Sequence, residues 1–144
     1  GGNKYGQLGN GTYNGESSPY HCYKWPKDIV DIKCGDSHTL VLTSSQEVYS
    51  CGNNNQFQIG RTTGGYTYSP ILRKVDALSE IIRIECGEYH SMCIDANYDL
   101  YVFGSNTYGQ LGLGDSSYAQ EITKHTLLSN VIDISKGGDH TFIK

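Results

Sequence analysis

Residues 104–112 read GSNTYGQLG, and the phrase occurs twice more, as GGNKYGQLG at 1–9 and GNNNQFQIG at 52–60. The leading glycines recur about every 51 residues. A phosphate-binding loop is normally needed once, whereas a phrase at a fixed spacing indicates a repeated structural unit. LGLGD at 111–115 also lacks the Lys-Ser/Thr of a P-loop, and no helix signal follows it. The phrase therefore predicts architecture and not nucleotide binding.

Three further phrases return in a fixed order between the copies of the glycine phrase. They comprise a short β-branched segment, a Gly-x-x-His motif with the strand after it, and a short segment that ends in glycine. The stretches are IVDIKCGDSHTLVL (29–42) with EVYSCG (47–52), IIRIECGEYHSMCI (81–94) with DLYVFG (99–104), and VIDISKGGDHTFIK (131–144). Ordered recurrence of several phrases identifies the chain as a repeat array.

Each unit is expected to contain four short strands. The β-branched segments lie between turn signals, and polar links of hairpin length join the later strands. A fourth strand is expected at 20–24, 71–75 and 122–126. Four short strands in roughly 51 residues are typical of a β-propeller blade. The predicted fold class is all-β, with about three blades of four antiparallel strands.

Two common propeller types do not fit the pattern. WD40 blades are shorter, and the only tryptophan, Trp25, is not part of a Trp-Asp pair. Kelch blades carry a Gly-Gly doublet, but the doublets at 1–2, 64–65 and 137–138 are out of step with the repeat.

The order G-x-N-x-Y-G-Q-L-G, loop, G-x-x-H-T and a strand ending in glycine resembles the repeats of the regulator of chromosome condensation (RCC1) family over all 144 residues. That resemblance implies a propeller of seven four-stranded blades. We expect one repeat domain at 1–144, with units at approximately 1–51, 52–103 and 104–144, the last of them incomplete. Three blades cannot close a ring and would leave sheet edges open. We therefore expect an incomplete propeller or a segment of a longer protein, completed by the remaining blades or by another copy.

The middle copy of the glycine phrase departs from the other two. Phe57 stands where Gly6 and Gly109 stand. If that glycine adopts a positive φ in a tight turn, Phe57 must be strained or its turn must be rearranged.

The Gly-x-x-His motifs supply the candidate site residues. A metal site needs ligands that converge on one point, whereas these histidines recur once per blade. One interpretation is structural, with each imidazole bonded to the backbone or to a neighbouring blade. The resemblance to the RCC1 family implies another, in which these loops face a protein partner and nearby carboxylates form a polar rim. The candidate partner-binding residues are Asp36, His38, Glu88, His90, Asp139 and His140.

Charge and cysteine content restrict the function classes. The formal net charge is −4, and no basic cluster is longer than a pair such as Arg73-Lys74, so direct nucleic-acid binding is not expected. No apolar run approaches the roughly 18 residues of a membrane span. Five cysteines without a CxxC favour a reducing compartment, so we expect an intracellular protein, cytoplasmic or nuclear. Cys34 and Cys86 are expected to be small buried residues at strand ends.

No arrangement of catalytic residues stands apart from the repeat, so we expect no enzymatic activity, metal or cofactor. The primary hypothesis is a non-enzymatic protein-binding scaffold. Its loops at 10–19, 61–69 and 113–121 vary while the frame repeats, and tyrosines gather in them. Two alternatives stay open, both implied by the resemblance. One is guanine-nucleotide exchange with a small GTPase as partner, and the other is a targeting module of a larger enzyme such as a ubiquitin ligase.

Overall fold

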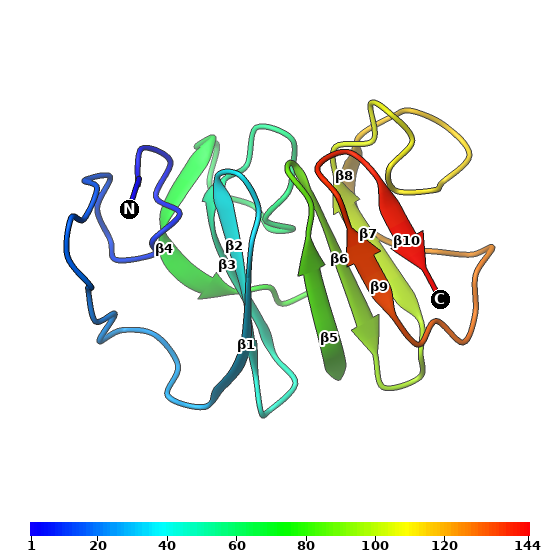
Figure 1. Cartoon of the computed structure of the whole chain (residues 1–144), viewed down its shortest axis with the longest axis horizontal. Helices are drawn as coiled ribbons and strands as arrows, with labels where there is room; N and C mark the ends of the chain where they lie inside the picture. The colour runs from blue at the N-terminus through cyan, green and yellow to red at the C-terminus, as the bar shows by residue number, and fades with distance from the viewer.

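The computed structural model describes all 144 residues and consists of ten β-strands without a helix. Two four-stranded antiparallel sheets, ordered β1-β2-β3-β4 and β5-β6-β7-β8, stand beside a hairpin of β9 and β10 (Figure 1). We call these blade 1, blade 2 and blade 3. The strands are β1 (Ile29–Cys34), β2 (His38–Thr43), β3 (Val48–Asn53), β4 (Tyr68–Lys74), β5 (Ile81–Cys86), β6 (His90–Asp95), β7 (Leu100–Gly104), β8 (Ala119–Lys124), β9 (Ile134–Lys136) and β10 (Thr141–Ile143). The all-β fold class and the blade architecture are confirmed.

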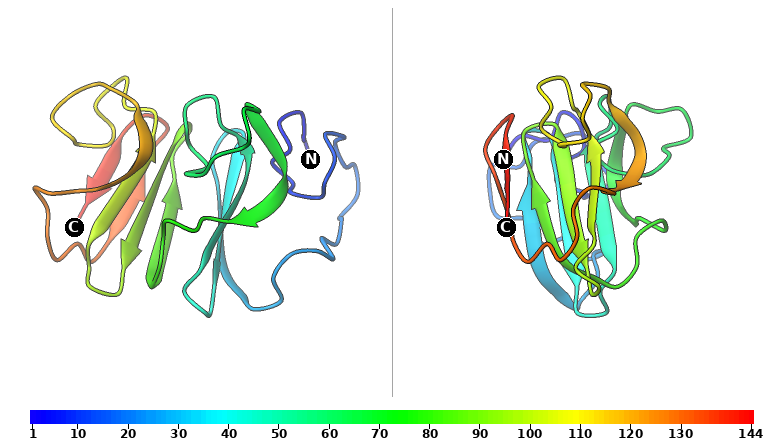
Figure 2. Two further views of the ribbon diagram at one scale, coloured as in Figure 1. Left: turned by 180° about the vertical axis from the view of Figure 1, so that it is seen from behind. Right: turned by 90° about the vertical axis from the view of Figure 1, so that its right-hand side faces the viewer.

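The three blades lie face to face, with the axes of their antiparallel strands roughly aligned (Figure 2). The second strand of each complete blade, β2 or β6, is buried along its whole length. One apolar core lies between blades 1 and 2 and includes Leu40 and Val48 of the first with Ile84 and Cys86 of the second. A second core, between blades 2 and 3, includes Met92 and Ile134. Packing between blades therefore supplies the hydrophobic core.

The expectation for Cys34 is wrong, although that for Cys86 is confirmed. Cys86 is fully buried because β5 packs against blade 1, whereas Cys34 is exposed. No blade covers the corresponding side of β1, and its neighbour Ile32 is 46% exposed for the same reason.

Each complete sheet takes its outer strand from the next copy of the repeat. β4 follows the glycine phrase at 52–60 but pairs with β3, which precedes that phrase. β8 pairs with β7 in the same way. The expected strands at 71–75 and 122–126 thus correspond to β4 and β8. The one expected at 20–24 is absent, and local turns occupy that segment.

Phe57 adopts the left-handed conformation that the glycines predict. Its φ is 64°, compared with 80° for Gly6 and 75° for Gly109. The turn is not rearranged, because Phe57 N donates to Asn54 O at 3.0 Å just as Gly109 N donates to Asn106 O at 2.9 Å. The middle copy therefore keeps the turn at the expense of a strained backbone.

Candidate partner-binding face

The three Gly-x-x-His motifs form the β1–β2, β5–β6 and β9–β10 turns, which lie in a row along one edge of the molecule (Figure 1). Adjacent turns are joined through their backbones. Asp36 N donates to Glu88 O at 3.2 Å, and Glu88 N donates to Gly138 O at 3.0 Å. The loops therefore form one continuous edge rather than three independent turns.

The motif histidines of blades 1 and 2 join each blade to the next. His38 Nε2 lies 2.9 Å from Ser91 Oγ, and His90 Nε2 lies 3.1 Å from Thr141 Oγ1. Ser91 Oγ already donates to Gln58 O at 2.7 Å, so the Nε2–H of His38 is the donor to Ser91. Both imidazoles are almost fully buried. The structure thus shows the interblade bonding that the structural interpretation describes.

The motif glycine is required by the histidine ring beside it. A Cβ on Gly87 would lie 1.9 Å from His90 Cε1, and one on Gly35 would lie 2.2 Å from His38 Cε1. Neither glycine has a positive φ. The small residue therefore makes room for the imidazole rather than permitting an unusual backbone conformation.

Burial also holds these two imidazoles in the neutral form. Desolvation, assisted by the nearby His90, lowers the pKa of His38 to about 3. Desolvation lowers the pKa of His90 to about 4, while Asp139 acts in the opposite direction. Neither Nδ1 atom has a hydrogen-bond partner. These side chains act inside the structure and present no atom for contact with a partner.

The other four candidate residues remain accessible. Asp36, Asp139 and His140 are exposed, and Glu88 is half-buried. The Glu88 carboxylate contributes most to raising the pKa of the Tyr89 phenol, and Asp36 and Asp139 raise it further. The three carboxylates therefore lie near Tyr89. We call Asp36, Glu88 and Asp139, together with Tyr89, the acidic rim.

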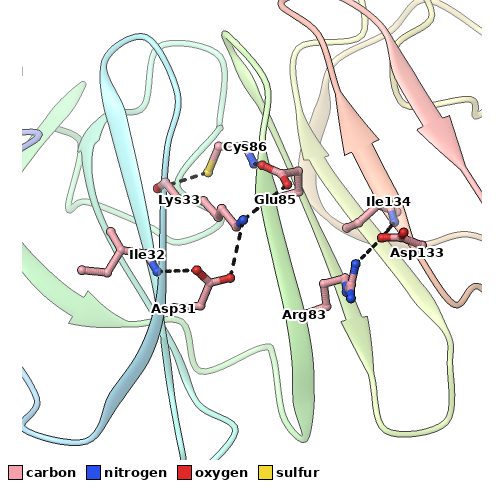
Figure 3. A network of polar contacts seen from close by, with 8 residues as sticks. All are labelled: Asp31, Ile32, Lys33, Arg83, Glu85, Cys86, Asp133 and Ile134. Atoms are coloured by element: carbon pink, nitrogen blue, oxygen red, sulfur yellow. Dashed lines mark hydrogen bonds and ion pairs between the residues drawn. The ribbon is translucent and has the colours of Figure 1, made fainter.

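A line of ion pairs on or next to the first strand of each blade was not predicted from the sequence (Figure 3). Lys33 Nζ lies 3.7 Å from Glu85 Oε2, joining blades 1 and 2, and Arg83 pairs with Asp133, joining blades 2 and 3. The signal was present, because opposite charges occupy matching positions in the aligned copies at 31, 83 and 133 and at 33 and 85. It shows only when the copies are compared position by position.

Two wider properties concern the whole chain. No set of three or more His, Cys, Asp or Glu side chains lies close enough together to hold a metal ion. No helix in the structure has the length and apolar character needed to cross a membrane.

Stacked four-stranded antiparallel blades, joined through a recurrent buried histidine, define this chain as part of a β-propeller. It belongs to the regulator of chromosome condensation (RCC1) repeat family. The family's sequence model matches residues 1–42, 46–94 and 99–143, and a second model of the same repeat matches 29–58 and 81–110.

Curated relatives come from several kinds of protein. The human "Probable E3 ubiquitin-protein ligase HERC4" is 32% identical over 143 residues, which cover 96% of this chain and 14% of that protein. The Schizosaccharomyces pombe "Protein pim1" is 35% identical over 127 residues, 79% of this chain and 23% of that protein. The chain thus spans less than a quarter of the length of either relative.

Solved structures share the fold. Prp20p of Saccharomyces cerevisiae, described with its binding to Gsp1p and histones, matches with a TM-score of 0.77 at 23% identity, covering 94% of this chain and 36% of that one. Human WBSCR16 matches with a TM-score of 0.74 at 28% identity, covering 95% of this chain and 38% of that one.

Proposed function

We propose that this chain is a non-enzymatic protein-binding part of an RCC1-type propeller and that the acidic rim contacts the partner. One observation carries the proposal. Three consecutive blades present the same loop on one edge, the backbone links these loops, and buried histidines anchor the first two, while carboxylates remain accessible. A rigid scaffold with exposed loops is a common arrangement for recognition, because little order has to be gained on binding.

The negative charge of the acidic rim favours a partner surface that carries basic residues. Asp36, Glu88 and Asp139 supply three carboxylates near Tyr89, and tyrosine is frequent at protein interfaces because it joins apolar area to a hydroxyl. The same carboxylates and the net charge of −4 oppose contact with nucleic-acid phosphates. A protein partner is also consistent with Prp20p, which is described as binding Gsp1p and histones.

The proposal is tested by binding of immobilised core histones and a panel of small GTPases to the full protein. Changing Asp36, Glu88 and Asp139 together to Ala is expected to abolish capture of the true partner. Changing the exposed Glu121 to Ala, on the outer strand β8, is the matched control and should leave capture unchanged. If the triple variant captures that partner as well as the wild type does, the rim is not the binding surface.

A second candidate function is guanine-nucleotide exchange on a small GTPase, favoured by the fold shared with Prp20p and its described binding to Gsp1p. Release of a fluorescent guanine nucleotide from the GTPase panel distinguishes the two. Stimulated release would replace the scaffold proposal.

A third candidate is a targeting module of a larger enzyme, favoured by the alignment of 143 residues with a probable ubiquitin ligase. Ubiquitin transfer by the full protein, lost on deleting a separate catalytic domain but not on altering the rim, would support it.

We also propose that residues 1–144 form part of one repeat domain, with units at approximately 1–51, 52–103 and 104–144, completed by further blades. The five free cysteines, three of them buried, are consistent with an intracellular location in the cytoplasm or nucleus. Microscopy of the tagged full protein tests the location, and a secreted product would contradict it.

A further inference from the structure

A second surface shares no residue with the acidic rim and lies where the loop before β4 meets that outer strand. It forms a pocket of about 560 Å³ whose only charged lining residues are Arg61 and Arg73. Tyr13, Tyr66 and Tyr68 also line it, together with hydroxyl groups of the loop. The pocket is therefore cationic within a chain that is negative as a whole.

Arg61 is held in one orientation by the sheet. Its Nε donates to Ser50 Oγ at 3.0 Å, and its Nη2 donates to Ser50 O at 2.9 Å, Ser69 Oγ at 2.7 Å and Ile71 O at 3.1 Å. These groups flank the point where the pairing of β3 with β4 shifts register. Asn10 and Leu113 occupy the matching positions of the other copies, so this arginine is particular to one copy of the repeat.

The positive charge of Arg61 has no counter-ion in the chain. All four acceptors are neutral, Nη1 makes no hydrogen bond, and neither Arg61 nor Arg73 takes part in any of the five ion pairs. Partial burial lowers the pKa of Arg61, and the nearby Arg73 lowers it further. Cations removed from water are normally paired with an anion, so the partly buried Arg61, beside the exposed and unpaired Arg73, indicates a place for an external anion.

We propose that this pocket binds an acidic side chain of a protein partner, whose carboxylate or phosphoryl oxygens lie between Arg61 and Arg73. The fork of N–H groups on a guanidinium matches both kinds of oxyanion, and the loop hydroxyls add neutral donors. The surrounding tyrosine rings supply apolar contacts for the residues that flank the anion. This inference depends on the proposed protein-binding function in one respect only, namely that the ligand is a peptide.

A peptide fits the pocket better than a nucleic acid does. Nucleic-acid affinity requires many phosphates to be neutralised along a basic stripe, and this surface offers two unpaired cations in one concavity. The overlapping groove, which shares Arg61 and Arg73 and continues toward the outer strand of blade 2, also contains Lys74, Asp76 and Glu121. Lys74 is paired with Glu47, so the other two carboxylates would repel a long polyanion, whereas a single acidic side chain does not have to pass them.

The test is fluorescence anisotropy of labelled peptides with the full protein. The first probe is a short peptide of Glu and Ser. In the second probe phosphoserine replaces each Ser and Gln replaces each Glu. The third probe is an uncharged peptide of Gln and Ser. At least one anionic peptide is expected to bind about tenfold or more tightly than the uncharged one, since hydrogen bonds between charged partners are the stronger kind. The anionic peptide that binds shows whether the pocket prefers carboxylate or phosphoryl oxygens.

Two variants localise the binding. Arg73→Gln changes an exposed side chain, and Arg61→Leu introduces the residue that the next copy carries at Leu113, so both are expected to fold and to bind about tenfold more weakly. Lys27→Gln, an exposed lysine away from the pocket, is the matched control and should bind normally. Circular dichroism checks the fold, and Arg73→Gln decides the outcome if Arg61→Leu is unfolded.

Several results would overturn the proposal. These are no saturable binding of either anionic peptide, equal binding of the uncharged one, wild-type affinity in a folded Arg73→Gln variant, or tighter binding of a single-stranded RNA oligomer. The acidic rim shares no residue with the pocket, so loss of histone or GTPase capture on changing the rim is a separate result.

Discussion

Replacing Gly87 with Ala should test whether the motif glycine exists to accommodate the histidine ring. The added Cβ would lie 1.9 Å from His90 Cε1 and 2.3 Å from His90 Nδ1, whereas ordinary contacts exceed about 3.4 Å. The ring must therefore move by more than an ångström. That movement breaks the 3.1 Å contact between His90 Nε2 and Thr141 Oγ1, which joins blades 2 and 3.

The expected cost combines two effects. Overpacking a well-filled core costs about 1–3 kcal/mol, and a lost buried hydrogen bond costs about 0.5–1.5 kcal/mol. Gly87→Ala should therefore lower the free energy of unfolding by about 1.5–4.5 kcal/mol. The measurement is urea unfolding of the full protein, followed by circular dichroism and analysed by linear extrapolation.

Two controls separate the ring from other causes. Gly138→Ala is the first control, because Gly138 follows the motif glycine of blade 3 and its Cβ would meet only the flexible carboxylate of Glu88 at 3.2 Å. Its expected effect is within about 0.5 kcal/mol. In a His90→Ala background, Gly87→Ala should cost less than about 1 kcal/mol, because the ring is gone. An equally large cost with and without the ring would refute the reasoning.

Three further predictions concern charge and backbone strain. His38 and His90 stay neutral in the folded state down to about pH 3 and pH 4, whereas the unfolded chain binds protons below about pH 6.5. Stability should therefore fall by up to about 4 kcal/mol between pH 7 and pH 5, and a flat profile of urea midpoints would contradict this. Arg83→Gln should cost less than about 1 kcal/mol, because its pair with Asp133 is half exposed, and the cost should shrink in urea titrations at high salt. Phe57→Gly should be more stable to thermal unfolding than Phe57→Ala by about 0.5–1 kcal/mol, because φ is 64° there. The reverse order would show that this turn carries no strain.

Most of the fold followed from the sequence because it depends on local pattern. β-branched segments predicted β1 and β5 closely, whereas β9 begins only at the last residue of the segment at 131–134. The glycine spacing indicated a left-handed or rearranged turn at Phe57, and the left-handed one is present. These features are set by residues a few positions apart, where conformational preferences act directly.

The sequence-based predictions that failed concern residues whose surroundings are set by a neighbouring blade. Cys34 has the same sequence context as Cys86, yet only Cys86 is covered by a neighbouring sheet. The segment at 20–24 has a composition that suits a strand, yet its backbone hydrogen bonds are local, from Tyr23 N to His21 O and from Trp25 N to Cys22 O. Similarly, a Gly-x-x-His motif on its own does not reveal that the ring of His38 bonds Ser91, which lies in the next copy. Contacts between copies require knowledge of how the copies stack.

The pairing of β3 with β4 across the glycine phrase has a mechanical consequence. Because β4 of one copy completes the sheet of the copy before it, consecutive copies of the repeat are joined by the hydrogen bonds of a shared sheet. A pulling force along the chain would have to shear this strand out of its sheet before the two copies could separate. Such interlocking favours resistance to partial detachment, so a protein built this way is suited to holding its binding surface in place under load.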